Sequence, residues 1–427
     1  MNSLQSPTAP HDELIGTAQE LHRELLRSLD LRRCDVISMP ADALRQLAAA
    51  AIATAIASRP LPPGLDAPQL AQFVLDEALG LGPLEALLRD SSVTEIMVNG
   101  PNEIFVERAG QITPVPIRFS SEAALRGVIE RIVAPLGRRV DDASPMVDAR
   151  LGDGSRVNVV LPPLAVRGPV VTIRRFQRGL RRVEDLLAAG TLSEPMLDFL
   201  ALCVRYRRNI VISGGTGSGK TTLLNVLSSL IPAEERLVTI EDAAELALEH
   251  RNLVSLEARQ PNAEGRGEVT IRDLVRNALR MRPDRIVIGE CRGGEALDML
   301  QAMNTGHEGS LTTVHANSPR DVLSRLEVMA LMSGLDLPAT AIREQIAAAV
   351  HIIVHQGRFS SGLRRVTSIA EVTGIESGRI QMQELFRFRG AALDSTGFEA
   401  LGIVPAFYER LARAGITIAP ANSAACP

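Results

Sequence analysis

The stretch Gly214-Gly215-Thr216-Gly217-Ser218-Gly219-Lys220-Thr221-Thr222 decides how the rest of this 427-residue chain is interpreted. It fits the pattern G-x-x-x-x-G-K-[ST] in full. Glycines let a backbone wrap closely around a polyphosphate, so that several N–H groups converge on its oxygens. The lysine supplies a positive charge for the β- and γ-phosphates, and Thr221 offers a hydroxyl to Mg²⁺. The stretch therefore predicts a site for ATP and Mg²⁺.

The segments on either side of this loop support the prediction. Asn209 to Ser213 is a short apolar run typical of a buried strand, and Thr222 to Ile231 has the apolar face of a helix that ends before Pro232. A strand, a glycine-rich loop and a helix, in this order, are the context that a phosphate-binding loop requires. The alternative, a glycine-rich turn without a ligand, is disfavoured by this context.

Patterning predicts four parts along the chain. Residues 1–63 contain a charged and an alanine-rich helical pattern and are expected to form a mobile helical appendage. Residues 64–176 mix strand and helix patterns, as in a small α+β domain. Residues 177–190 are the predicted linker, because arginines dominate their first half. Residues 191–427 alternate short apolar runs with helical segments, which indicates an α/β domain with a mostly parallel sheet covered on both faces.

Composition excludes several classes of protein. The net charge is −4, and the chain has no Trp, two Tyr and ten Phe, so neither charge nor base-stacking platforms indicate a direct nucleic-acid partner. The four cysteines are scattered, without a C-x-x-C pair, which argues against a zinc site or a disulfide framework. The longest alanine- and isoleucine-rich run is too short to span a bilayer. We therefore expect a cytoplasmic protein, with any membrane attachment made through partners.

Acidic residues follow two of the predicted strands. Glu290 ends the apolar run that begins at Arg285, and Glu295 comes five residues later. Glu241 ends another apolar run. Because ligands bind at the carboxyl ends of parallel strands, Glu241 and Glu290 are candidate Mg²⁺ ligands beside Thr221, and Glu295 is the first choice for polarising the attacking water. The alternatives are solvated loop acids and, for Glu241, a carboxylate that caps a helix.

Two histidines, His307 and His315, flank the predicted strand from Ser310 to His315. Metal binding is disfavoured at this spacing without a third ligand nearby. A histidine that bonds the γ-phosphate would report hydrolysis to the strand that carries it. This sensor role and that of an ordinary core histidine both remain open.

With these stretches identified, the chain strongly resembles the secretion ATPases of the type II/IV (GspE/VirB-type) superfamily, and most closely the CpaF-type motor of tight-adherence (Tad/Flp) pili. Residues 214–222 match that family's Walker A motif, 239–246 its Asp box, 282–295 its atypical Walker B motif and 305–318 its His box. The resemblance covers about residues 66–390. In two departures, the four-cysteine zinc module of some pilus motors is missing, and Gly293 and Gly294 stand where many relatives place an acid.

The resemblance implies a RecA-like P-loop domain preceded by a PAS-like domain, in a homo-hexameric ring. It implies that arginines of the N-terminal domain, with Arg150, Arg156 and Arg174 as candidates, neutralise charge at a nucleotide; surface ion pairs are the alternative. The implied partner is an inner-membrane platform protein, through which pilin is moved indirectly. A conjugation or type IV secretion ATPase, a nucleic-acid translocase and a non-hydrolysing ATP binder are the other candidates.

Overall fold

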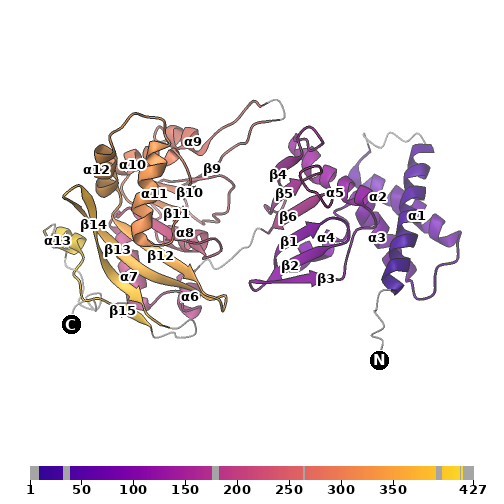
Figure 1. The fold of residues 1–427 in the computed structure, drawn as a ribbon, viewed down its shortest axis with the longest axis horizontal. Helices are drawn as coiled ribbons and strands as arrows, with labels where there is room; N and C mark the ends of the chain where they lie inside the picture. Colours follow the sequence, from indigo (N-terminus) through magenta and orange to yellow (C-terminus); the bar gives the residue numbers. More distant parts are fainter. Residues whose placement is uncertain are drawn as a thin grey trace. The chain divides into compact units, whose positions relative to one another are not determined.

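The computed structural model describes residues 9–31, 39–175, 182–262, 265–390, 397–413 and 415–416. Contacts divide the chain into two units, Met1–Gln177 and Arg178–Pro427 (Figure 1). The first residues of the predicted linker, 177–181, lie outside the described ranges. Among the described helices, none is both long and apolar enough to cross a lipid bilayer.

The first unit begins with three helices, α1 (Ala9–Leu31), α2 (Ala41–Ala57) and α3 (Ala67–Leu79). They pack together through apolar residues that are at most 7% exposed, namely Ala18, Leu21, Leu25, Ala48, Ile52, Ala55, Leu70, Val74 and Leu75. The Asp66 carboxylate caps α3 by accepting a hydrogen bond from the Gln69 amide. The boundary predicted at residue 63 thus falls between α2 and α3, within one shared core.

A six-stranded antiparallel sheet forms the rest of this unit. Its strand order is β3-β2-β1-β6-β5-β4, and its strands are β1 (Val93–Asn99), β2 (Ile104–Arg108), β3 (Gln111–Val115), β4 (Met146–Arg150), β5 (Arg156–Val160) and β6 (Val170–Arg174). The helices α4 (Leu84–Arg89) and α5 (Glu122–Val133) share a core with it, and a 3-10 turn, Ala134–Leu136, follows α5. This is the α+β arrangement that the alternating patterns predict.

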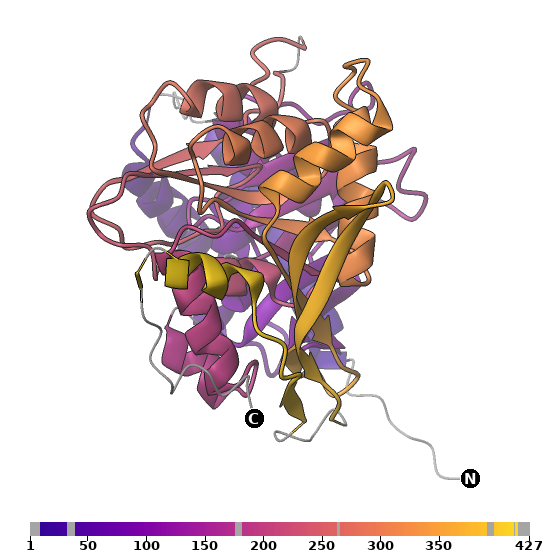
Figure 2. The ribbon, with the colours of Figure 1, turned by 90° about the vertical axis from the view of Figure 1, so that its left-hand side faces the viewer.

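The second unit is built on a nine-stranded sheet with the order β15-β14-β13-β12-β7-β11-β10-β8-β9. Six strands are parallel: β7 (Ile210–Gly214), β8 (Leu237–Glu241), β9 (Leu253–Glu257), β10 (Arg285–Cys291), β11 (Leu311–His315) and β12 (Ile352–Arg358). The antiparallel strands β13 (Arg364–Glu376), β14 (Arg379–Phe388) and β15 (Phe398–Ala400) extend one edge (Figure 2). The RecA-like α/β fold expected from the sequence is confirmed.

Helices cover both faces of this sheet because alternate residues of each strand point to opposite sides. Val211 of β7 joins the core beneath α9 (Ile271–Ala278), α10 (Glu295–Asn304), α11 (Pro319–Leu331) and α12 (Ala339–Ala349). Its neighbours Ile210 and Ile212 join the opposite core, beneath α6 (Val183–Ala188), α7 (Glu194–Arg205), α8 (Lys220–Ser228) and α13 (Ala406–Arg413). β7 therefore lies in the middle of the unit and positions the loop that follows it.

Candidate nucleotide site

The glycine-rich loop connects the end of β7 at Gly214 to the start of α8 at Lys220. Gly217 and Gly219 have φ angles of 69° and 97°, which side chains other than glycine rarely adopt. A Cβ on Gly214 would lie 2.2 Å from the backbone oxygen of Gln356 and 2.6 Å from the Ser218 hydroxyl. The loop thus requires glycine for its own geometry as well as for a ligand.

Polar groups of the loop are arranged as a phosphate cradle requires. Lys220 Nζ donates hydrogen bonds to the backbone oxygens of Gly214 (3.1 Å) and Gly215 (3.0 Å), so its charge lies over the loop. Ser218 is 1% exposed, and its hydroxyl has no partner among the described residues. A buried polar group without a partner is costly, and a phosphate oxygen would supply one. These residues fit ATP.

Strand register brings most of the other predicted residues to the same edge of the sheet. His315 on β11 lies opposite Gly214, and Ile240 on β8 lies opposite Ile288 on β10. Glu241 is therefore next to Gly289, where a built Cβ would lie 3.0 Å from the Glu241 Cγ. Since these strands are parallel, Glu241, Glu290 and His315 all lie at the carboxyl edge together with the loop.

Glu241 is bound within its own segment. It is 3% exposed, and its Oε1 accepts hydrogen bonds from the backbone amides of Glu245 (2.8 Å) and Leu246 (3.0 Å). The carboxylate therefore holds the turn that follows β8. This is close to the capping role that the sequence leaves open, although the residues it caps do not form a helix.

The other two acids are engaged by the loop between β10 and α10. Glu290 forms an ion pair with Arg292 (2.8 Å), and this contact raises the pKa of the Arg292 guanidinium. Glu295, the first residue of α10, accepts hydrogen bonds from the backbone amides of Arg292 (2.6 Å) and Gly293 (2.8 Å). Both carboxylates thus lie at the loop end where the sequence predicts them.

A metal site made by protein alone is missing from the described part of the chain, where no three His, Cys, Asp or Glu side chains are grouped to hold an ion. Mg²⁺ commonly takes one or two protein ligands and completes its shell with water and substrate phosphates. Thr221, in the first turn of α8, and the acids Glu241 and Glu290 fit that limited requirement.

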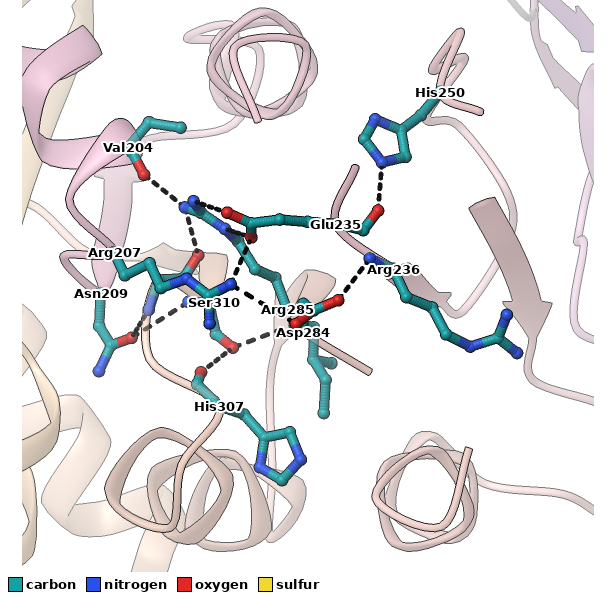
Figure 3. Close-up of polar contacts among 12 residues, drawn as sticks. Val204, Arg207, Asn209, Glu235, Arg236, His250, Asp284, Arg285, His307 and Ser310 are labelled. Carbon is teal, nitrogen blue, oxygen red and sulfur yellow. Dashed lines mark hydrogen bonds and ion pairs between the residues drawn. The ribbon is translucent and has the colours of Figure 1, made fainter. Parts of the chain in front are cut away.

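His307 lies at the opposite edge of the sheet. Leu311, the first residue of β11, is paired with Ile210 at the start of β7, and His307 precedes it. A strand of five residues spans roughly 13 Å. Figure 3 shows His307 beside Ser310, whose hydroxyl donates to the His307 backbone oxygen at 2.8 Å. The structure thus places His315, and not His307, at the carboxyl edge beside the loop.

An ionic network lies at the same edge of the sheet as His307. Arg285 is 0% exposed and binds Glu235 through Nε (2.6 Å) and Nη2 (3.0 Å), and it also donates to the backbone oxygen of Val204 (Figure 3). Arg207 reaches Glu235 (3.4 Å) and Asp284 (3.5 Å). These pairs fasten the amino ends of the strands to the end of α7.

Two residues of β12 at the carboxyl edge were not predicted from the sequence. His355 Nδ1 lies 2.9 Å from the Ser213 hydroxyl; burial lowers the pKa of His355, with Lys220 acting in the same direction and Asp321 opposing it. Gln356 is 3% exposed and is paired with Gly214. Both follow the apolar run that ends at Val354, so the pattern that identified Glu241 and Glu290 also marks them.

In the first unit, Arg150, Arg156 and Arg174 lie in one row. Arg150 on β4 is paired with Arg156 on β5, which is paired with Arg174 on β6. Glu95 on β1 continues the row and lies 3.8 Å from Arg174. Guanidinium groups match phosphate oxygens in geometry, so this row of three arginines is a candidate anion-binding surface.

Comparison with known proteins places this architecture in a family. Residues 77–367 match the model of the Type II/IV secretion system protein family. The chain belongs to this family of secretion ATPases.

Three curated relatives of this family are similar over most of their length. A putative conjugal transfer protein of Mycobacterium tuberculosis is 43% identical, over 71% of this chain and 88% of its own. The conjugal transfer protein TrbB of Rhizobium radiobacter is 36% identical, over 72% of this chain and 92% of its own. The type IV secretion system protein VirB11 of Brucella suis is 36% identical, over 64% and 84%. These matches do not separate the CpaF-type branch from others.

Proposed function

We propose that this protein hydrolyses ATP and uses the energy to drive transport by a secretion or pilus machine. The observation that carries the proposal is the shared edge of the sheet, where the glycine loop and Lys220 meet acids from neighbouring strands. A non-hydrolysing ATP binder does not need Glu241, Glu290 and Glu295 at this edge. Membership in the secretion ATPase family supports the same function.

Each group at the edge has a proposed role. The loop amides and Lys220 hold the β- and γ-phosphates, and Thr221 binds Mg²⁺ with Glu290 or Glu241. A Mg²⁺ ion held by these residues would supply positive charge against the charge that develops during hydrolysis. Glu295 orients the attacking water after its carboxylate leaves the Arg292 and Gly293 amides, since hydrogen bonds at catalytic groups are often rearranged when substrate binds. His315, opposite Gly214, takes the sensor role in place of His307.

The arginine row of the first unit is proposed to neutralise phosphate charge in a homo-hexameric ring. Arg150, Arg156 and Arg174 offer guanidinium groups side by side, a geometry suited to phosphate oxygens. We assign this role to the row as a whole and do not choose one of the three arginines.

The machine served is proposed to be a Tad/Flp-type pilus, with an inner-membrane platform protein as the direct partner and pilin as the indirect one. The protein would then work on the cytoplasmic side of the inner membrane. A conjugation or type IV secretion machine is the second candidate, because the three relatives reported above carry those names. Co-purification of a platform protein together with prepilin genes next to this one would favour the first; a conjugation gene set would favour the second.

Phosphate release tests the proposed activity. The purified protein is expected to release phosphate from ATP, and EDTA is expected to stop release. Failure to hydrolyse ATP at any protein concentration would contradict the proposal. Anisotropy of labelled DNA separates the motor from a translocase, since a translocase should bind with a steep dependence on salt.

A further inference from the structure

A pair of arginines on the β12–β13 hairpin lies beside the glycine loop. Arg358, the last residue of β12, is paired directly with Arg364, the first residue of β13. Two residues before Arg358, Gln356 is paired with Gly214. The hairpin therefore extends past the carboxyl edge at the position where the loop begins.

Both arginines approach the same glycine. Arg364 Nε donates a hydrogen bond to the Gly217 backbone oxygen at 2.9 Å. A Cβ on Gly217 would lie 3.0 Å from the Arg358 Nη1, and one on Gly219 would lie 3.1 Å from the Arg364 Cδ. The loop glycines thus leave room for two guanidinium groups as well as for a ligand.

Two guanidinium groups beside one glycine of the loop suit an anionic ligand, because guanidinium groups match phosphate oxygens in geometry. Inside the same loop, the Ser218 hydroxyl is buried without a partner among the described residues. The buried Gln356 side chain, beside Gly219, likewise has an Oε1 without a partner in the part of the chain that is described.

We propose that Arg358 and Arg364 bind the diphosphate part of the nucleotide from the side opposite the acids, and this inference rests on the proposed function. In the sheet, β12 flanks β7 on one side, while β11, β10 and β8 follow on the other. The γ-phosphate must face Glu290 and Glu295, which lie on that second side. The α- and β-phosphates are therefore the ones within reach of the arginine pair, and ADP contains both.

ADP affinity is the direct test, measured by calorimetry on the full chain at low and moderate salt. The Arg358→Ala/Arg364→Ala variant is expected to bind ADP about tenfold more weakly or worse, since charge-assisted hydrogen bonds are lost. The dependence of ADP affinity on salt should also be shallower, because two cations are removed. The Arg358→Lys/Arg364→Lys variant is expected to recover part of the affinity. Turnover at saturating ATP should change by less than about threefold, since the pair is remote from the bond that breaks.

Arg379→Ala is the matched control. Arg379 is an exposed arginine on a hairpin of the same sheet, but it pairs with Glu376 at the far end of β13. Its removal should leave ADP affinity unchanged. Because Arg364 also holds the Gly217 oxygen, Arg358→Ala is measured by itself and decides the question if the double variant unfolds.

The outcomes separate the inference from the function on which it rests. Unchanged ADP affinity in the arginine variants, with normal binding by the wild type, overturns the inference alone. A fall in turnover at saturating ATP with unchanged ADP affinity also overturns it, because the pair would then act on the γ-phosphate. Absence of ADP binding by the wild-type protein overturns both proposals.

Discussion

Both the packing of the fold and the proposed nucleotide site require a glycine at position 214. Its φ of 155° and the 2.2 Å between a built Cβ and the Gln356 oxygen leave no space for a side chain. The next residue, Gly215, has nothing within 4 Å of a built Cβ. Two adjacent glycines of one motif therefore have different reasons to be glycine.

Replacing each of these two glycines by alanine shows which one is required for packing. Gly214→Ala is expected to lower stability by about 1–3 kcal/mol, because the methyl group collides with the backbone of β12. Gly215→Ala should leave stability within about 0.5 kcal/mol. Thermal unfolding without nucleotide measures both. Equal melting temperatures for the two variants would contradict the packing argument.

Glu235 is predicted to matter for stability alone. Glu235→Ala leaves the fully buried Arg285 without its carboxylate, which should cost about 3–5 kcal/mol. Glu234→Ala is the control, since the neighbouring glutamate is exposed. Chemical denaturation measures the difference, and a change below about 1 kcal/mol in the Glu235 variant would show that Arg285 does not depend on the pair.

At the scale of elements, sequence reasoning found the strands that are buried on both faces. The apolar runs that predict β7, β8, β10, β11 and β12 are recovered within a few residues. It did not find β3, whose residues are mostly exposed, or the edge strand β9, whose short apolar run is interrupted by Ser255.

The prediction of the site residues has the same limit, because sequence patterns do not show which strands and residues lie side by side. Residue spacing predicted acids at the ends of apolar strands, and the structure has Glu241 as the last residue of β8 and Glu290 within β10. Spacing did not show at which end of β11 each of the two histidines lies. Strand direction and register place the two histidines at opposite ends of β11, and the sequence pattern gives neither. Arg358 and Arg364 were not predicted because their relation to Gly217 depends on a contact between residues about 150 positions apart in sequence.

The β12 strand carries a pH-dependent prediction. Burial holds the pKa of His355 below its ordinary 6.5 in the folded protein. Above pH 6.5 the ring is neutral in both states; as pH falls below that value the unfolded chain takes up the proton first, so stability falls. His355→Gln should remove this contribution to the pH dependence of stability, which is at most about 1.4 kcal/mol per pH unit. Denaturation between pH 7.5 and 5 tests it, and parallel profiles for wild type and variant would contradict it.

At the scale of the whole molecule, two units carry two sets of arginines with different proposed tasks. The row on β4, β5 and β6 is assigned to charge that develops during hydrolysis, whereas the β12–β13 pair is assigned to the diphosphate. Arg156 lies in the middle of the row, so replacing it tests whether the row has the task assigned to it.

Arg156→Ala is expected to lower turnover about tenfold or more while ADP affinity in the isolated subunit stays constant. Steady-state phosphate release and calorimetry measure the two quantities. Arg126→Ala, which removes a partly exposed arginine of α5 that pairs with Glu122, is the control. Loss of ADP affinity with unchanged turnover in the Arg156 variant would assign the row a different task.

The central claim is that the loop binds ATP and the acids at the same edge of the sheet cleave it. Calorimetric ATP binding and phosphate release, measured together on Lys220→Ala and Glu295→Gln, test it most directly. Both variants are expected to lose hydrolysis, and only Glu295→Gln is expected to keep ATP binding near the wild-type affinity. Tight ATP binding by Lys220→Ala, or wild-type turnover by Glu295→Gln, would contradict the account.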